Sequence, residues 1–178
     1  MHSIRPASWR RVLAVDLDLC IRCNRLAAFE PPRRLFALVS RLGDGIFWYT
    51  LMLMLPVIYG LEAIVVSLQM AGVALAGLLL YKQLKGRTSR QRPFQVTPAI
   101  QVGTAPLDHF SFPSGHTLHA VAFSLVAVGH YPELSWFLVP FTALVMASRV
   151  VLGLHYPSDV IAGAVLGAAI AQLSFQLI

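Results

Sequence analysis

The sequence A-I-V-V-S-L-Q-M-A-G-V-A-L-A-G-L-L-L-Y, residues 63–81, contains no charged residue over 19 consecutive positions. A helix of about 20 mostly apolar residues is long enough to cross the hydrocarbon core of a bilayer. The composition agrees, because 57% of the residues are hydrophobic and only 12% are charged, whereas a soluble domain has about 25% charged residues. The chain of 178 residues therefore predicts one domain that uses the bilayer as its solvent.

Further apolar stretches lie on both sides of this segment. They cover residues 46–60, 117–129, 134–152 and 159–178, and the last is rich in Gly and Ala. Small residues of this kind let helices pack closely in lipid. Together the stretches predict an all-α fold, a polytopic transmembrane helix bundle of about five spans.

The first 43 residues have a different character. Residues 12–26 show a helical period that charged side chains interrupt, Pro31 and Pro32 follow, and residues 35–42 resume the apolar pattern. We interpret residues 1–43 as an N-terminal amphipathic segment at the membrane interface, with a helix packed against the bundle as the alternative. Residues 44–178 then form the transmembrane domain.

Several tryptophans and cysteines fit ordinary structural roles. Trp9, Trp48 and Trp136 are interpreted as interface anchors. Cys20 and Cys23 form a lone C-x-x-C, which favours two ordinary helix residues over a redox pair or a disulfide. A structural zinc site needs four ligands, and no second cysteine pair exists.

Alternation of five spans places the polar segments on one side of the membrane. The N-terminal segment, residues 82–115 and residues 152–158 share one face, while the turns near Glu62 and Glu133 share the other. Every chemically interesting segment is therefore expected at the same end of the bundle.

Three cations on that face indicate that the chain binds an anion. Lys85, Arg92 and Arg149 stand in the polar segments or beside them, and Arg149 interrupts an apolar run. An ionisable side chain in such a run is costly and usually functional. Arginine presents a planar fork that matches phosphate oxygens. The net charge of +6 is accordingly assigned to phosphate and anionic headgroups rather than to nucleic acid.

Two histidines and one carboxylate complete the set. Ser114 and Gly115 precede an expected helix, where free backbone N–H groups favour an anion. His116 and His155 lie beside the cations, so one can attack phosphorus while the other protonates the leaving oxygen. Asp159 follows His155 by four residues and is expected to accept a hydrogen bond from its ring.

These residues form three motifs with fixed spacing. They are Lys85 to Pro93 as K-x6-R-P, Pro113 to His116 as P-S-G-H, and Ser148 to Asp159 as S-R-x5-H-x3-D. The set closely resembles the type 2 phosphatidic acid phosphatase family, whose haloperoxidase branch consists of large soluble proteins.

The resemblance implies a role for each matching residue. His155 would be the nucleophile that forms a phosphohistidine, Asp159 would orient it, and His116 would be the general acid. Lys85, Arg92, Ser114, Gly115 and Arg149 would bind the phosphoryl oxygens. No metal and no cofactor is expected, because cations already neutralise the charge of the transition state.

The resemblance also implies the activity. It indicates an integral membrane lipid phosphatase acting on a phosphomonoester or a pyrophosphate, with undecaprenyl pyrophosphate, phosphatidylglycerophosphate and phosphatidate as substrate candidates. A phosphotransferase between lipids and a non-enzymatic transporter or assembly protein are the alternatives. The implied location is a bacterial inner membrane with the active site on the periplasmic face. The arginines of residues 1–43 favour a cytoplasmic active site by the positive-inside rule, and this placement is the alternative. The motifs specify neither the lipid nor an oligomeric state.

The remaining basic residues near the motifs have a simpler interpretation. Lys82, Arg87 and Arg90 are expected to be solvated or to face lipid headgroups. His109, His119 and His130 belong to no motif and are interpreted as incidental histidines.

Overall fold

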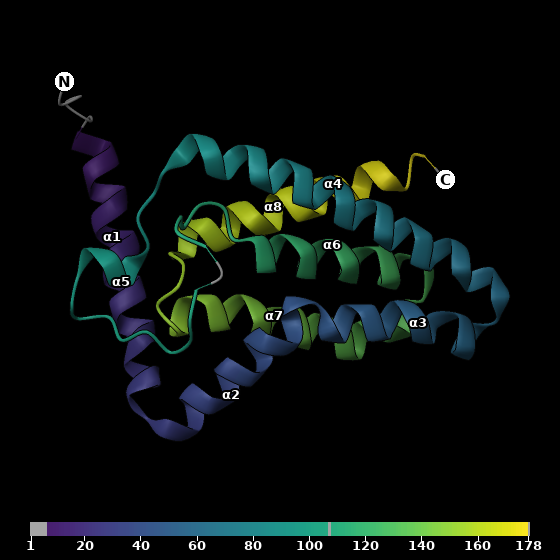
Figure 1. The fold of residues 1–178 in the computed structure, drawn as a ribbon, viewed down its shortest axis with the longest axis horizontal. Coiled ribbons are helices and arrows are strands. Elements are labelled where there is room, and N and C mark those ends of the chain that lie inside the picture. Colours follow the sequence, from purple (N-terminus) through teal and green to yellow (C-terminus); the bar gives the residue numbers. More distant parts are fainter. Residues whose placement is uncertain (1–6, 107, 178) are drawn as a thin grey trace.

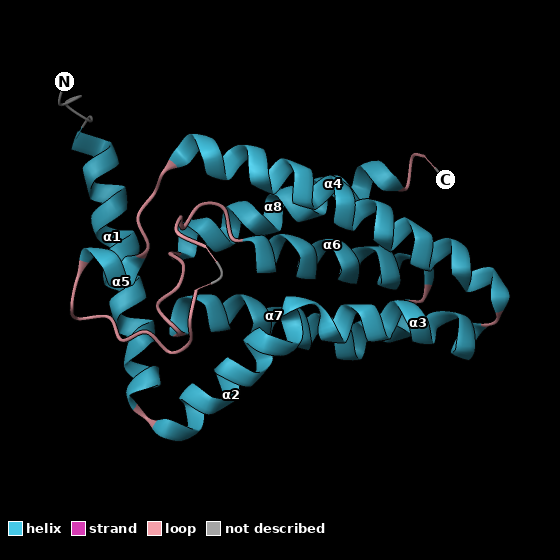
Figure 2. Cartoon of the chain, in the orientation of Figure 1, coloured by secondary structure: helices cyan, strands magenta, loops and turns pink. Residues whose placement is uncertain are grey.

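The computed structural model describes residues 7–106 and 108–177, and within these ranges the chain is helical with connecting loops (Figure 2). The long helices are α1 (Ala7–Asn24), α2 (Glu30–Arg41), α3 (Phe47–Tyr59), α4 (Ile64–Thr88), α6 (Gly115–His130), α7 (Ser135–Val151) and α8 (Pro157–Ser174). The short helical turns are Arg25–Ala28, Leu42–Ile46, Leu61–Ala63, α5 (Pro93–Val96) and Pro132–Leu134. The all-α prediction is confirmed.

The helices α3, α4, α6, α7 and α8 run along the long axis of the molecule, and α1 crosses one end of this bundle (Figure 1). The central helix is α6, which packs against α4, α7 and α8. The short helix α5 and the start of α8 lie at the same end as α1. This arrangement agrees with the alternation argument, because it gathers the polar segments at one end.

Four helical segments of the described chain are long and apolar enough to cross a membrane, namely Glu30–Tyr59, Leu61–Val96, Pro132–Val151 and Pro157–Ser174. The helix α6 lies in the sequence between the second and the third of these segments and has 16 residues. The prediction of a polytopic membrane bundle is confirmed, whereas the number of five spans stays a prediction.

The N-terminal segment is continuous with the bundle. A single π-helical turn, Leu42–Ile46, joins α2 to α3, and Gly45 within it has φ 140°, a conformation that other residues rarely adopt. The predicted boundary between residues 43 and 44 falls inside this turn, and the division into two segments stays a prediction. Because α1 packs on α7 and α8, the N-terminal helix also has the packed position that we gave as the alternative.

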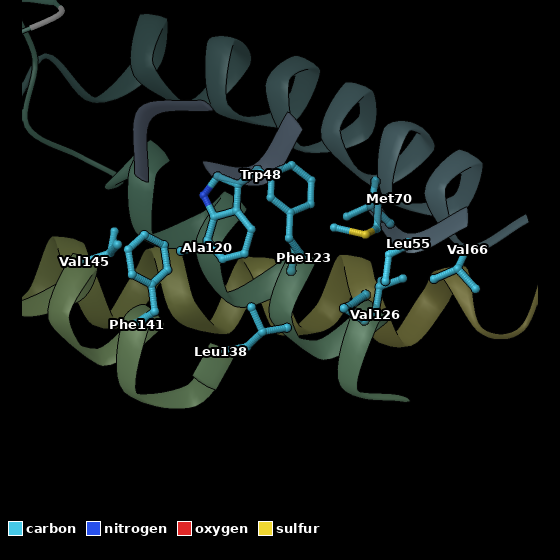
Figure 3. Close-up of a cluster of buried hydrophobic side chains, with 14 of the residues drawn as sticks. Trp48, Leu55, Val66, Met70, Ala120, Phe123, Val126, Leu138, Phe141 and Val145 are labelled. Atoms are coloured by element: carbon cyan, nitrogen blue, oxygen red, sulfur yellow. The ribbon is translucent and has the colours of Figure 1, made fainter. Parts of the chain in front are cut away.

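The largest buried cluster includes Trp48, Met70 and Phe123, and it fills the bundle between α3, α4, α6 and α7 (Figure 3). Trp48 is only 1% exposed, and its indole N–H donates to the carbonyl oxygen of Gly43 at 3.1 Å. The expectation that Trp48 anchors the interface is therefore wrong, because its ring belongs to the core. Trp136 is exposed, and the side chain of Trp9 lies outside the described residues.

Two glycines bring α8 against α6 at backbone distance. A Cβ on Gly163 would lie 2.5 Å from the carbonyl oxygen of Ser114, and one on Gly167 would lie 2.3 Å from that of Leu118. Only glycine fits at such separations. The outer faces of the helices keep large apolar side chains exposed, as lipid contact requires.

Candidate active site

The nucleophile that the motifs predict lies in the loop between α7 and α8. The loop turns at Gly153, which has φ +71°, and a Cβ there would lie 2.4 Å from Ile100. His155 follows two residues later and is 2% exposed. Its backbone N–H donates to the carbonyl oxygen of Arg149 at 3.0 Å. The turn thus returns the histidine to the end of α7.

The hydrogen bonds of the His155 ring determine its tautomer. Nδ1 lies 2.6 Å from the carbonyl oxygen of Ser111, which can only accept a hydrogen bond. Nε2 lies 3.3 Å from Nη1 of Arg92, which can only donate. The proton is therefore on Nδ1, and Nε2 carries a lone pair that points at a cation of the first motif. This is the form in which imidazole acts as a nucleophile.

The surroundings of His155 keep its ring neutral. Burial lowers the pKa of His155 to about 4, and the nearby Arg149 and Arg92 act in the same direction against the carboxylate of Asp159. The lone pair on Nε2 is consequently present at neutral pH.

Asp159 contacts His155 differently from our expectation. It stands in the first turn of α8, as predicted, but its Oδ2 is 3.8 Å from Nδ1 of His155. The carboxylate instead accepts a hydrogen bond from the hydroxyl of Ser111 and one from the N–H of Tyr156 at 2.8 Å. The predicted direct hydrogen bond is replaced by a path through Ser111, because the carbonyl oxygen of that residue already takes the ring proton.

One carboxylate joins two of the predicted phosphate ligands. Asp108, in the loop before α6, forms an ion pair with Lys85 from α4 and a second with Nη2 of Arg92 at 2.8 Å. The hydroxyl of Tyr81 also donates to it. Burial alone would raise the pKa of Asp108, but these hydrogen bonds lower it to about 2. Asp108 is therefore an anion held where the first motif is expected to bind phosphate.

The third cation has spare binding capacity. Arg149 is 3% exposed, and its Nη1 donates to the hydroxyl of Ser40 on α2. Its Nε is a buried donor without a partner among the described residues. A buried unpaired N–H costs about 1–3 kcal/mol, and a bound anion would supply the missing acceptor.

The second histidine faces a cavity. His116, in the first turn of α6, lies with Arg149 in the wall of a cavity of about 440 Å³. The rest of that wall comes from α2, the turn after it and a loop, through Ala37, Leu38, Ser40, Arg41, Asp44, Thr104 and Ala105. Nε2 of His116 lies 3.4 Å from Oδ1 of Asp44. His116 thus adjoins the space that a leaving group could occupy.

The start of α6 differs in one respect from the sequence argument. The backbone N–H of Ser114 is not free, because it donates to the carbonyl oxygen of Asp159 at 3.1 Å. The free N–H groups belong to the first turn of the helix itself, beginning with Gly115. A Cβ on Gly115 would lie 2.8 Å from the ring of Tyr81. Glycine thus allows α4 to approach this turn closely.

The interpretation of Arg90 is wrong. Its side chain is only 20% exposed and forms ion pairs with Asp16 and Asp159, each at 2.6 Å, whereas Lys82 and Arg87 are exposed as expected. Sequence reasoning also missed Asp16, Asp44 and Ser111. Of these three residues, only Asp16 stands out in the sequence, because it is a carboxylate among the apolar positions of residues 12–26.

The three motifs thus meet at one end of a helical bundle, around a buried neutral histidine and three cations. The model of the PAP2 superfamily matches residues 66–178, which include all three motifs. The chain belongs to the PAP2 superfamily. In this PAP2 protein the matched region begins in α4, so α1 to α3 lie outside it.

Curated relatives of this PAP2 chain are phosphatases of lipid-linked phosphates. An undecaprenyl-diphosphatase of Sulfolobus acidocaldarius is 31% identical over 165 residues, which are 92% of this chain and 77% of the relative. A decaprenylphosphoryl-5-phosphoribose phosphatase of Mycobacterium tuberculosis is 42% identical over 106 residues, 58% of this chain and 54% of the relative.

Solved structures share the PAP2 fold of this chain. Aquifex aeolicus LpxE superimposes with a TM-score of 0.79 at 23% identity and covers 91% of this chain and 95% of its own. A PAP2-type phosphatidylglycerolphosphate phosphatase of Bacillus subtilis gives 0.68 at 24% identity, with 99% and 87% covered. These likenesses establish the architecture.

The PAP2 match, the lipid phosphatase relatives and the apolar helices together make the chain a multi-pass membrane enzyme that hydrolyses phosphate esters of lipids. Among the described residues, no three His, Cys, Asp or Glu side chains lie together in a way that could hold a metal ion. The cations of the motifs, together with Arg41 in the cavity wall, are positive charges that the described site offers to a phosphate.

Proposed function

We propose that this PAP2 enzyme hydrolyses a phosphomonoester or pyrophosphate of a membrane lipid through a phosphohistidine on His155. The observation that carries the proposal is the state of that ring. It is neutral and protonated on Nδ1, and its Nε2 lone pair lies 3.3 Å from the guanidinium of Arg92. A phosphoryl group bound by the guanidinium would stand next to the lone pair.

In the first step, Nε2 of His155 attacks phosphorus and a P–N bond forms. The bond from phosphorus to the leaving oxygen breaks, its electron pair goes to that oxygen, and His116 supplies the proton. In the second step, water attacks the phosphohistidine, gives a proton to His116 and releases phosphate as the P–N bond breaks. Lys85, Arg92 and Arg149 offset the negative charge throughout.

The substrate class that we propose is a lipid whose phosphate is carried on a long apolar tail. The relative with 31% identity across 92% of this chain is an undecaprenyl-diphosphatase, which supports a prenyl diphosphate as the first candidate. Phosphatidylglycerophosphate and phosphatidate are the glycerolipid candidates. The cavity beside His116 is lined in part by Leu38 of α2, and Leu35, three residues earlier on the same helix, is also exposed. These apolar side chains would accommodate the start of a lipid chain.

A panel of lipid phosphates tests both the activity and the substrate. Purified protein in detergent is expected to release inorganic phosphate from at least one of undecaprenyl pyrophosphate, phosphatidylglycerophosphate and phosphatidate, and to keep this activity in a chelator. Acid-labile, base-stable radioactivity at His155 after a short incubation with labelled substrate would identify the intermediate. Transfer of label to a second lipid without phosphate release would instead identify a phosphotransferase.

We infer that the motif end faces the periplasm, as the resemblance to bacterial PAP2 enzymes implies. The arginines of α1 and α2, among them Arg22, Arg33 and Arg34, lie at this end and favour the cytoplasm by the positive-inside rule. A membrane-impermeant thiol reagent distinguishes a periplasmic from a cytoplasmic motif end. We expect it to label Gln101→Cys in intact spheroplasts once both native cysteines are replaced, because the Gln101 side chain is exposed. Labelling only after permeabilisation would place the site in the cytoplasm.

A further inference from the structure

The N-terminal helix contacts the catalytic loops through one buried carboxylate. Asp16 of α1 is 6% exposed. Its Oδ1 accepts a hydrogen bond from the N–H of Ser158 at 3.0 Å, and its Oδ2 accepts one from the hydroxyl of the same residue. The third donor is Nη2 of Arg90, at 2.6 Å. Asp16 is therefore tied to the first turn of α8 and to the loop after α4.

Arg90 carries the connection towards the nucleophile. Its Nη1 donates to Oδ1 of Asp159 at 2.6 Å and to the hydroxyl of Ser158 at 2.7 Å. The guanidinium also lies over the ring of Tyr156, with 3.9 Å from its carbon to the ring centroid. Both neighbours of His155 in this network, Tyr156 and Asp159, thus contact the same arginine.

The chain of contacts ends at the ring of His155. Asp159 accepts the hydroxyl proton of Ser111, and the carbonyl oxygen of Ser111 accepts the ring N–H. The order of contacts is Asp16, Arg90, Asp159, Ser111 and His155. Displacement at the start of this chain would change the orientation of the imidazole at its end.

The charges along this path alternate and are largely removed from water. Asp159 is 0% exposed, and Arg90 shares its charge between Asp159 and Asp16. If Asp16 were neutral, Arg90 would pair with Asp159 alone and weaken the attraction between Asp159 and a cationic His155 ring. Removing one partner of a buried ion pair costs more than the pair itself contributes.

A second polar contact keeps α1 in this position. Asn24 donates from Nδ2 to the carbonyl oxygens of Val151 at 2.8 Å and Gln101 at 2.9 Å. Its Oδ1 accepts the N–H of Gln101 at 2.8 Å. The helix that sequence analysis assigned to the membrane interface is thereby attached at two points to the loops of the site.

We propose that Asp16 and Arg90 are positioning residues for the nucleophile, so that α1 is part of the catalytic apparatus. This inference rests on the proposed role of His155. Neither side chain contacts Nε2 of His155, the atom that would take the phosphoryl group, because Asp16 and Arg90 reach the ring only through Asp159 and Ser111 on its Nδ1 side. Their loss should slow the covalent step and leave phosphate binding unchanged.

The test uses Asp16→Asn, Arg90→Lys and the double variant in the full-length protein. Asparagine keeps the shape of Asp16 without its charge, and lysine keeps the charge of Arg90 without the two-branched fork that reaches both carboxylates. Asp18→Asn on α1 and Arg87→Lys on α4 are matched controls, because both side chains are exposed. All proteins are compared by gel filtration and thermal unfolding in the same detergent.

We expect each single variant to lower kcat about tenfold and the double variant to lower it by about the same factor, because residues in one charged network are not independent. KM and inhibition by inorganic phosphate should stay unchanged. Inhibition by vanadate should weaken with kcat, since vanadate in its five-coordinate form also needs a bond to Nε2 of His155. A loss of packing alone would change inhibition by phosphate and inhibition by vanadate to the same extent.

Three results would overturn the inference. They are unchanged kcat in folded Asp16→Asn and Arg90→Lys proteins, a hundredfold loss in the double variant from independent tenfold losses, or weaker inhibition by phosphate with unchanged kcat. These outcomes differ from a failure of the proposed function. In that case the wild-type protein would release no phosphate, or His155→Ala would retain activity.

Discussion

The two histidines of the site stand in contrasting surroundings. His155 is 2% exposed, and protein atoms contact both of its ring nitrogens. His116 lines a cavity, and its recorded polar partner is the partly exposed Asp44, 3.4 Å away. A nucleophile must be held in one orientation and one tautomer, whereas a general acid must reach whatever oxygen departs. The contrast supports the proposed roles, the covalent step for His155 and the proton transfer for His116.

The largest effect should follow from removing the fixed histidine. His155→Ala is expected to reduce phosphate release below detection, because without Nε2 no phosphohistidine forms. The matched control is His130→Ala, at the opposite end of the bundle, which should leave kcat within about twofold, as surface changes far from a site usually do. Substantial turnover by folded His155→Ala would reverse the assignment of the two histidines.

A smaller and substrate-dependent loss is expected at the cavity histidine. His116→Ala should lower turnover of a lipid phosphate roughly 10²–10⁴-fold, the usual contribution of general acid catalysis. Hydrolysis of p-nitrophenyl phosphate should fall much less, because nitrophenolate departs without a proton. Equal losses with both substrates would show that His116 acts in some way other than protonating the leaving group.

A smaller effect is expected at the cations beside the fixed histidine, where Asp108 takes the place of a phosphate. Asp108→Asn should strengthen inhibition by inorganic phosphate several-fold, because it frees Lys85 and Arg92 from a competing carboxylate. Asp18→Asn, an exposed carboxylate on α1, is the control. Weaker inhibition by phosphate would mean instead that Asp108 holds the two cations in their binding positions.

The smallest effect concerns the titration of the nucleophile. Since burial lowers the pKa of His155 to about 4, its ring should gain a proton only near that pH, and Nε2 should stay unprotonated through the neutral range. NMR of protein with labelled histidine, assigned with His155→Asn, measures the midpoint directly. A midpoint near 6.5, the value of an ordinary histidine, would contradict the buried neutral ring.

The sequence predicted the helices and the motif residues for separate reasons. Apolar runs such as residues 63–81 allow no soluble alternative, so they determine the helical class. Motif spacing brings Lys85, Arg149 and His155 to one end once the spans alternate. Neither kind of pattern identifies a side chain's partner across the fold, which is why Trp48 in the core and Arg90 between two carboxylates were misplaced.

The contacts of Asp159 illustrate the same limit at closer range. Spacing i to i+4 from His155 predicted a direct hydrogen bond, and the two residues do lie close together. The turn at Gly153 and the loop before α6 deliver a carbonyl oxygen of Ser111 to the ring first. Nδ1 lies 2.6 Å from that oxygen and 3.8 Å from Oδ2 of Asp159, and residue order does not specify loop geometry that finely.

The glycines on α8 have a consequence for genetics. Gly163 and Gly167 touch the backbone of α6, and α6 begins with the second motif while α8 begins with the third. The separation of the two motifs is thus determined by main-chain contact at the start of α6, at Ser114, and about one helical turn further along it, at Leu118. A screen for inactive alleles should therefore recover alanine at Gly163 or Gly167, in proteins that still insert, accumulate and retain every ionisable group of the site.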